Sequence, residues 1–219
     1  MMANDSMGTW VPKTELGKSV MNGSVASLDE IFAAGKIIKE PQIVDKLVPV
    51  LDNELIFVGG SAGKGGGKRM TSTKRTTRMH MSGRRYTISS VACIGNKNGY
   101  IGIGKASAKE NRIAIAKAVE NAKLNMIPVK RGCGSWECAC TDAHSIPMMA
   151  EGKVGSVKVV LLPAPKGIGL CINNEAKKMM RLAGIKDVWA KSYGHTSSHV
   201  NYAYAVFDAL KKMNLHKVK

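Results

Sequence analysis

Apolar and polar residues alternate from residue 84 to residue 94, which is the period-two pattern of a β-strand with two usable faces. A turn-forming run with an Asn-Gly pair follows at 95–99 and is a strong β-hairpin signal. The returning strand then occupies residues 100–104, whose two glycines allow another backbone to approach closely. One further strand is expected upstream, at Leu55–Val58. The pattern therefore predicts a hairpin preceded by one more strand.

Helical patterns flank this hairpin on both sides. A long helix is expected at about Ser107–Met126, and Pro128 ends it. The residues expected to form its buried stripe are Ile115, Val119, Ala122 and Met126. Upstream, Ser27 is expected to cap a helix that stops near Gly35, and a short helical or extended piece follows at 41–51.

A second α/β segment follows in the last third of the chain. Residues 155–162 alternate as a strand, and Asn173 or Asn174 is expected to cap a helix that Gly184 ends. A short strand at 185–190 precedes a last helix, which Ser197 or Ser198 caps. This β-α-β-α order predicts helices packed on one face of a sheet.

The pattern divides the chain into five parts and predicts an α+β fold with two domains. These parts are a flexible tail at 1–27, a first domain at 28–128, a connector at 129–147, a second domain at 148–214 and a tail at 215–219.

The charge distribution indicates what the first domain binds. The chain carries 33 Lys+Arg against 16 Asp+Glu, a formal net charge of +17, and residues 55–109 hold eleven basic side chains without one carboxylate. Because a block of like charge repels itself, its counter-charge must come from another molecule. Phosphate is the best candidate, since each neutralised phosphate releases condensed counterions. The alternative, a merely solubilising face, would carry dilute and mixed charge.

Part of this acid-free stretch is a glycine-rich basic insert, residues 59–78, with almost no large apolar residue. It is expected to be disordered in the free protein and to order on RNA. The predicted RNA-binding residues are the eleven basic side chains of the stretch, two on the following helix, two in the connector and one in the second domain. They are Lys64, Lys68, Arg69, Lys74, Arg75, Arg78, Arg84, Arg85, Lys97, Lys105, Lys109, Arg112, Lys123, Lys130, Arg131 and Lys166.

Three other classes of protein are disfavoured. No apolar run approaches the roughly 20 residues that span a bilayer, so no membrane association is expected. Five cysteines, an odd number, fit a reducing compartment and hence a cytoplasmic location. The run Gly99–Lys105 matches most of a phosphate-binding loop, but Ala106 stands where that motif needs a hydroxyl for magnesium, which argues against nucleotide binding.

A cluster of metal-ligand residue types lies in the connector. Cys133, Cys138, Cys140 and His144 fall within twelve residues, and three thiolates with one imidazole can close a tetrahedral zinc shell. The alternative is three ordinary reduced thiols without metal. A catalytic zinc is not favoured, because four protein ligands leave no open position.

The chain resembles the small-subunit ribosomal protein five family, in its archaeal form, over about residues 28–214. The stretches that carry the resemblance are Ser82–Arg85, Val91–Gly104, Ala116–Pro128, Arg131–Cys140, His144–Pro147, Glu151–Val160, Leu162–Gly169, Arg181–Val188 and Ala205–Leu210.

The resemblance implies a structural protein without catalytic activity. It implies a first domain like a double-stranded-RNA-binding module and a second α/β domain with a left-handed β-α-β crossover. The partners it implies are small-subunit ribosomal RNA near the neck, messenger RNA at the entry channel, and ribosomal proteins four and eight. It also implies a contribution to translational accuracy. A stand-alone RNA-processing enzyme and a double-stranded-RNA-binding regulator remain as alternatives.

Overall fold

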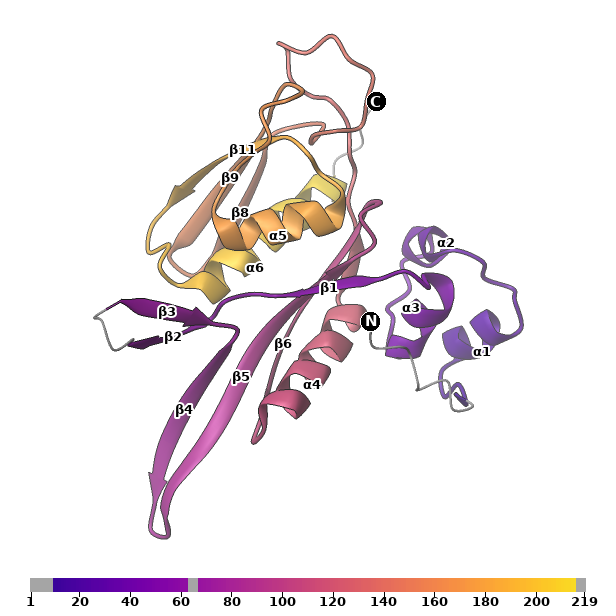
Figure 1. Cartoon of the computed structure of the whole chain (residues 1–219). Coiled ribbons are helices and arrows are strands. Elements are labelled where there is room, and N and C mark those ends of the chain that lie inside the picture. Colours follow the sequence, from indigo (N-terminus) through magenta and orange to yellow (C-terminus); the bar gives the residue numbers. More distant parts are fainter. Residues whose placement is uncertain (1–9, 63–66, 216–219) are drawn as a thin grey trace. The chain divides into compact units, whose positions relative to one another are not determined.

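The computed structural model describes residues 10–62 and 67–215, which form two compact units, Met1–Val50 and Leu51–Lys219 (Figure 1). Among the described residues, the first unit holds three short helices, and the second holds all the strands and the three longer helices. The second unit begins 23 residues after the predicted start of the first domain at residue 28. The helices expected near 28–51 therefore belong with the N-terminal segment rather than with the sheet.

The first unit contains α1 (Glu15–Met21), α2 (Leu28–Ala33) and α3 (Pro41–Leu47). The prediction of a flexible tail at 1–27 is corrected where α1 lies, and residues 1–9 fall outside the described residues. The Thr14 hydroxyl caps α1 by accepting a hydrogen bond from the Gly17 backbone N–H at 3.0 Å. Helix α2 begins after Ser27 as predicted, although the Ser27 hydroxyl bonds the Glu30 carboxylate rather than a backbone N–H.

Glu40 holds the segment before α1 in place. One of its oxygens accepts a hydrogen bond from the Trp10 indole at 2.9 Å, and the other accepts the Thr14 backbone N–H at 2.6 Å. Burial acts to raise the pKa of Glu40, but these hydrogen bonds outweigh it and hold the pKa below its ordinary value of 4.5. The order of this segment thus depends on a contact between residues 26 to 30 positions apart.

The first sheet of the second unit has the order β1-β5-β6-β7, with β4 also paired to β5. Its members are β1 (Asp52–Leu55), β4 (Thr73–His80), β5 (Gly83–Gly95), β6 (Tyr100–Ala108) and β7 (Met126–Pro128). The predicted hairpin is confirmed, with Cys93 opposite Ile103. The first strand lies three residues earlier than expected, because Asp52 and Leu55 pair with Gly95 and Ala92 in the buried half of β5.

The described part of the insert predicted to be disordered forms strands instead. These are β2 (Gly59–Ala62), β3 (Lys68–Thr71) and β4, while residues 63–66 lie outside the described residues. Strand β4 pairs with β5 over its whole length, from Thr73 opposite Ser90 to His80 opposite Gly83. Strand β4 therefore forms through main-chain pairing and threonine-rich composition. It does not need the buried apolar side chains whose scarcity led to the prediction of disorder.

Helix α4 (Asn111–Leu124) packs on one face of this sheet at very short range. A Cβ atom at Gly104 would collide with the backbone of Ala118 and Ala122. The two β6 glycines thus allow the close approach that the sequence predicted. The buried stripe, however, consists of Ala114, Ala118 and Ala122, while Ile115 is only half-buried. Alanines occupy the contact because a larger side chain would hold the helix away from the strand.

The second sheet has the order β10-β11-β9-β8. Its strands are β8 (Ala150–Val154), β9 (Val157–Pro163), β10 (Leu170–Cys171) and β11 (Val188–Tyr193). Helix α5 (Asn174–Ala183) joins the parallel pair β10 and β11 in a β-α-β unit, and it ends at Gly184 with φ +81°. Helix α6 (His199–Leu215) follows and packs against β8 and β9.

One buried cluster contains apolar side chains from both sheets, including Ile103 of β6 and Val159 of β9. Helix α5 lies between the sheets (Figure 1). It also holds the segment that follows β1. The buried Glu175 carboxylate accepts the Phe57 backbone N–H at 2.8 Å and lies 3.2 Å from the Lys178 ammonium. That ammonium also stands 3.7 Å from the centre of the Phe57 ring. The two predicted domains therefore share one core.

Gly104→Ala tests the close packing of α4 on β6. The added methyl must displace the helix backbone, so we expect a loss of at least about 3 kcal/mol, the upper end of ordinary overpacking costs. For a chain of this size that corresponds to a melting temperature lower by about 6–12 °C. Gly60→Ala is the control, because a Cβ atom there makes only ordinary contacts with Met70 and Arg69. Equal melting temperatures for the two variants would refute the packing argument.

The Glu40 contacts predict an acid-sensitive first unit. Because the pKa of Glu40 is depressed in the folded state, its contribution is present above pH 4.5 and is lost as pH falls through the folded-state pKa. Fluorescence of Trp10 reports this transition when Trp136 and Trp189 are replaced by Phe. Glu40→Gln removes the titrating group, so its fluorescence should not change over that pH range. A transition of the same size in Glu40→Gln would contradict the assignment.

Candidate nucleic-acid interface and metal site

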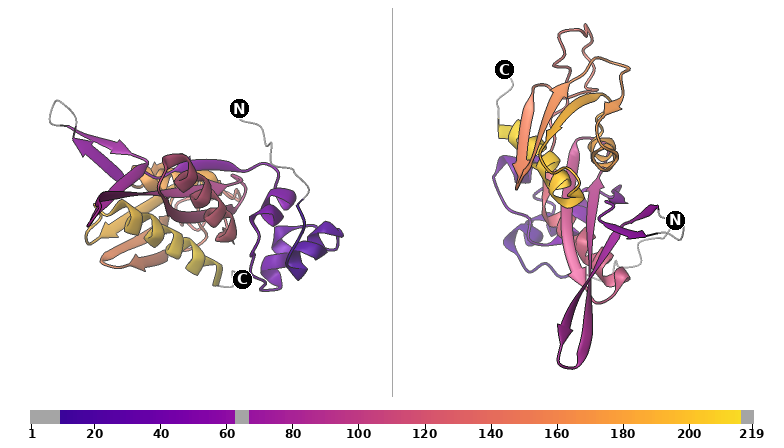
Figure 2. Two further views of the ribbon diagram at one scale, coloured as in Figure 1. Left: turned by 90° about the horizontal axis from the view of Figure 1, so that it is seen from below. Right: turned by 90° about the vertical axis from the view of Figure 1, so that its left-hand side faces the viewer.

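The β4–β5 ribbon is an arm that extends away from the two sheets (Figures 1 and 2). Strand β6 ends at Ala108 opposite Ile88, so the part of β5 before Ile88 has only β4 as a neighbour. Residues 74–82 and 84–87 are all exposed. The ribbon therefore offers both of its faces to a partner.

Basic side chains crowd this ribbon without local compensation. Arg78 lies directly opposite Arg85, a pairing of like charges that destabilises an antiparallel sheet in isolation. The Arg75 guanidinium lies 4.8 Å from the centre of the Tyr86 ring, and the Arg85 guanidinium donates to the Ser82 hydroxyl at 3.1 Å. Neither contact neutralises charge. A polyanion that binds the ribbon would therefore relieve the repulsion between the arginines.

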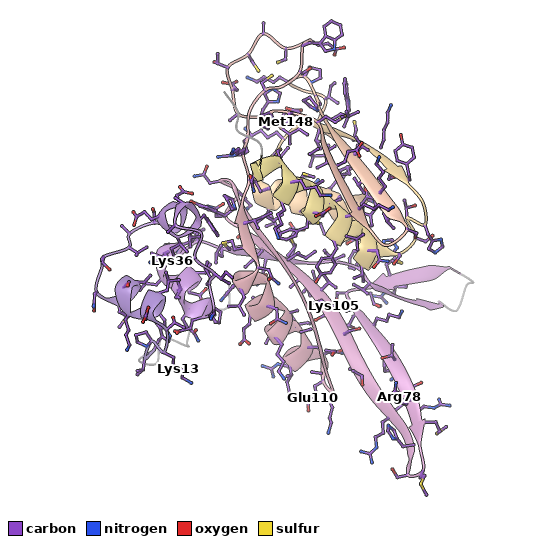
Figure 3. The ribbon with its side chains drawn as sticks, turned by 180° about the vertical axis from the view of Figure 1, so that it is seen from behind. Lys13, Lys36, Arg78, Lys105, Glu110 and Met148 are labelled. Carbon is purple, nitrogen blue, oxygen red and sulfur yellow. The ribbon has the colours of Figure 1, made fainter. Side chains whose placement is uncertain are left out.

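Further predicted residues lie at the root of the ribbon. The strand register aligns Arg75, Ile88 and Ala108 in one row across β4, β5 and β6. Lys109 follows that row directly, and Arg112 lies in the first turn of α4. Figure 3 shows Lys105 on β6, closer to the body of the unit than Arg78. All of these basic side chains are exposed, and Glu110 is the one acidic residue between Lys109 and Arg112, so the root extends the predominantly basic surface of the ribbon.

Other members of the predicted RNA-binding set lie elsewhere or are already paired. Lys97, in the hairpin turn, forms an ion pair with Asp52, which raises the pKa of Lys97. Lys166 pairs with Asp142 at 2.6 Å. Lys123 and Lys130 also have interaction partners. Lys64 lies outside the described residues, and only the backbone of Lys68 is described. Arg69 is exposed on β3.

A second basic surface includes residues that the sequence analysis missed. A concavity of about 810 Å³ is lined by Lys97, Arg131, Gly169, Leu170, Lys177, Arg181, Gly184, Ile185 and Lys186. Five of these nine are basic and none is acidic. Lys177 and Arg181 are four residues apart on α5, so helical spacing puts them on one face. The four-residue spacing is visible in the sequence. That these two side chains lie beside Lys97 and Arg131 follows only from the fold.

The connector forms a closed loop around the metal-ligand cluster. Gly132 and Ser145 exchange two backbone hydrogen bonds, both 2.9 Å long, and so join the ends of the loop. Gly134 lies against Pro147, where a Cβ atom would collide with the proline carbonyl. The structure describes every residue from 133 to 143, and none of them is buried. Apolar burial therefore does not account for the order of this loop.

The loop brings the four predicted ligands together. The sulfur atoms of Cys133, Cys138 and Cys140 and a ring nitrogen of His144 all lie within 4.8 Å of one another. The Cys138 sulfur is 3.0 Å from the Cys140 sulfur and 3.8 Å from Nε2 of His144. In a tetrahedral zinc shell, neighbouring sulfurs are about 3.7 Å apart. Only small side-chain shifts separate this arrangement from a complete shell.

The electrostatics of the cluster suit a metal ligand set. Hydrogen bonding with the Cys140 thiol, together with backbone N–H groups of Lys166 and Cys140, lowers the pKa of Cys138 to about 6. The same thiol contact raises the pKa of Cys140 to about 11. The contact between the two sulfurs thus favours one thiolate in the pair, and a cation would stabilise the remaining thiols in the same form.

Asp187 supports the imidazole ligand from behind. Its Oδ2 atom is 2.8 Å from Nδ1 of His144, and the two side chains are only 6% and 4% exposed. Metal-binding histidines usually donate their second ring N–H to such a carboxylate. Asp187 lies 43 residues from His144 in the sequence, so spacing gave no indication of it.

These features define the class of the protein: a basic α+β protein with an exposed arm whose charge suits a nucleic acid. Comparison with known proteins then gives the family. The ribosomal protein S5 N-terminal domain matches residues 68–130, and the S5 C-terminal domain matches residues 152–218.

Curated relatives cover nearly the whole chain. The chain is 46% identical over 212 residues to small ribosomal subunit protein uS5 of Pyrobaculum arsenaticum, covering 97% of this chain and 98% of that protein. It is 47% identical over 203 residues to uS5 of Picrophilus torridus, covering 93% and 85%. The chain belongs to the ribosomal protein S5 family. Within the described residues, no helix has the length and apolar character needed to span a bilayer.

Proposed function

We propose that the chain is a structural constituent of the small ribosomal subunit in the cytoplasm and that it binds ribosomal RNA through the β4–β5 ribbon and its root. The observation that carries this proposal is the uncompensated pairing of Arg78 with Arg85 on a ribbon whose residues 74–82 and 84–87 are all exposed. RNA phosphates supply the missing counter-charge. The relatives named as small ribosomal subunit proteins support the same role.

The resemblance to the family supports a finer proposal. In this finer proposal, the chain lies near the neck of the subunit and the messenger RNA entry channel and contacts ribosomal proteins four and eight. It also contributes to translational accuracy. The length of the exposed ribbon supports this placement, because an arm that leaves the core reaches RNA that the body does not contact. The second basic surface, around Lys177 and Arg181, offers a separate contact for an anionic neighbour.

Family membership favours this structural role over a stand-alone RNA-processing enzyme or a double-stranded-RNA-binding regulator. Sedimentation of a cell extract through a sucrose gradient separates the three functions. A structural constituent migrates with small subunits in fixed proportion, whereas an enzyme or a regulator stays mostly at the top of the gradient.

We further propose that Cys133, Cys138, Cys140 and His144 hold one structural zinc ion. Three observations support this: the convergence of the ligand atoms within 4.8 Å, the absence of buried residues among the described positions 133–143, and the carboxylate behind His144. Zinc would supply the ordering energy that burial does not. With four protein ligands the site is closed, so the ion has no catalytic position.

Replacing Arg84 and Arg85 by Ala tests the ribbon as the RNA interface. We expect weaker binding to small-subunit ribosomal RNA, because phosphate contacts are lost. The slope of log binding constant against log salt should fall by about one unit for each lost contact. The matched control replaces Lys153 and Lys191, which are exposed on the second sheet, and removes the same charge. If both double variants bind equally well and with the same slope, the ribbon is not the interface.

Elemental analysis of the purified, metal-replete protein tests the zinc site. We expect about one zinc per chain, lost in Cys138→Ser because a hydroxyl is a poor zinc ligand. Cys171→Ser is the matched control, since Cys171 is an exposed thiol outside the cluster and its loss should leave the zinc in place. A content below about 0.2 zinc per wild-type chain, too low for a closed four-ligand site, would show that the cysteines are ordinary thiols.

A further inference from the structure

The proposed zinc site is connected to a second loop through one carboxylate. The imidazole of His144 presents Nε2 to the cysteine cluster and Nδ1 to Oδ2 of Asp187. The other oxygen of Asp187, Oδ1, accepts the backbone N–H of Gly169 at 2.7 Å and that of Gly167 at 3.2 Å. A single buried side chain therefore bridges a candidate metal ligand and the loop at 164–169.

The backbone reinforces this bridge on both sides. The His144 carbonyl accepts the N–H groups of Lys186 at 2.8 Å and Asp187 at 3.1 Å. The neighbouring Ser145 hydroxyl accepts the Ala164 N–H at 3.1 Å, at the start of the same loop. A shift of His144 toward or away from the cysteines therefore moves the groups that hold the loop.

The ends of the loop are held, because Ala164 is buried and the Gly169 carbonyl accepts the Val188 backbone N–H at 3.2 Å, but its middle has few apolar contacts. Residues 166–168 are all exposed, and Gly167 and Gly169 adopt positive φ angles of +97° and +77°. Such glycine-rich backbone loses much conformational entropy when it is fixed. The loop also carries Lys166, one of the predicted RNA-binding residues, whose ammonium pairs with Asp142 of the connector at 2.6 Å. Polar contacts to Asp187 and to the connector thus order the middle of the loop.

We propose that Asp187 is a positioning residue that couples metal binding to the order of loop 164–169. This inference rests on the proposed zinc site. A metal on Nε2 of His144 requires the ring proton on Nδ1, where it is donated to Oδ2 of Asp187. Fixing that carboxylate also fixes the acceptor of the Gly167 and Gly169 N–H groups. The metal thereby sets the position from which Lys166 meets RNA.

The Asp187→Asn variant tests whether Asp187 couples the metal to the loop or only holds the loop in place. The asparagine oxygen can still accept the glycine N–H groups. Its amide N–H, however, donates to Nδ1 and drives the ring proton onto Nε2, the nitrogen that must hold the metal. The variant should therefore keep the fold and all four ligands but bind zinc about 10–100-fold more weakly. Competition with a chromophoric chelator measures this affinity, and Cys171→Ser serves again as the control.

Hydrogen exchange on the full-length wild-type protein gives a second readout that needs no substitution. Removal of zinc by a chelator should speed exchange at Gly167 and Gly169 by about tenfold or more, because local opening becomes easier. Exchange at Ile103, in the sheet core, should not change.

The outcomes distinguish the two proposals. If wild-type protein binds no zinc, the zinc site itself fails. If zinc binds but Asp187→Asn has wild-type affinity, or the two glycine amides exchange at the same rate with and without metal, the site stands and the coupling through Asp187 is refuted. Weaker binding together with faster glycine exchange supports the coupling.

Discussion

Strand β5 is buried on both faces over Val91–Gly95 and exposed over residues 84–87, and the rest of the second unit depends on how its buried half is held. On one face, α4 approaches β6 so closely that only glycine fits at position 104. On the other, a Cβ atom at Gly95 would collide with the backbone of Leu182 in α5. Because a one-residue slip would exchange the two faces, this double contact fixes the strand register. The charged half of β5 extends from that fixed point.

This anchoring explains how a chain can carry a block of uncompensated charge and still fold. The repulsion between Arg78 and Arg85 acts far from the core, where water and salt screen it. The buried half of the strand supplies the stability, so the ribbon can fold before any counter-charge binds, and its basic groups remain available for the proposed RNA contacts. A ribbon with charges on both faces suits recognition of RNA by shape and backbone, in which phosphates and 2′-hydroxyls matter more than base edges.

The sequence predicted the elements whose causes are local. Asn-Gly turn chemistry gave the hairpin, and Asn173 and Gly184 gave the ends of α5. It failed where distant residues decide: the start of α1 is held by Glu40, 26 positions from Thr14, and the buried stripe of α4 depends on the facing glycines. The site divides in the same way. The three cysteines and His144 were evident from spacing, whereas Asp187 and the basic residues of α5 converge on their partners only in the fold.

The connector shows why a small loop in a ribonucleoprotein would use metal rather than a core. A segment that faces RNA would keep polar and charged groups on its surface, and none of the described residues 133–143 is buried. Burial of apolar area at about 25 cal/mol per Å² is then not available to offset the entropy of ordering the loop. Metal–thiolate bonds deliver comparable energy from four side chains in a volume too small for a core. His144 is buried at the base of this loop, so zinc bound there as proposed would act directly on the buried carboxylate of Asp187.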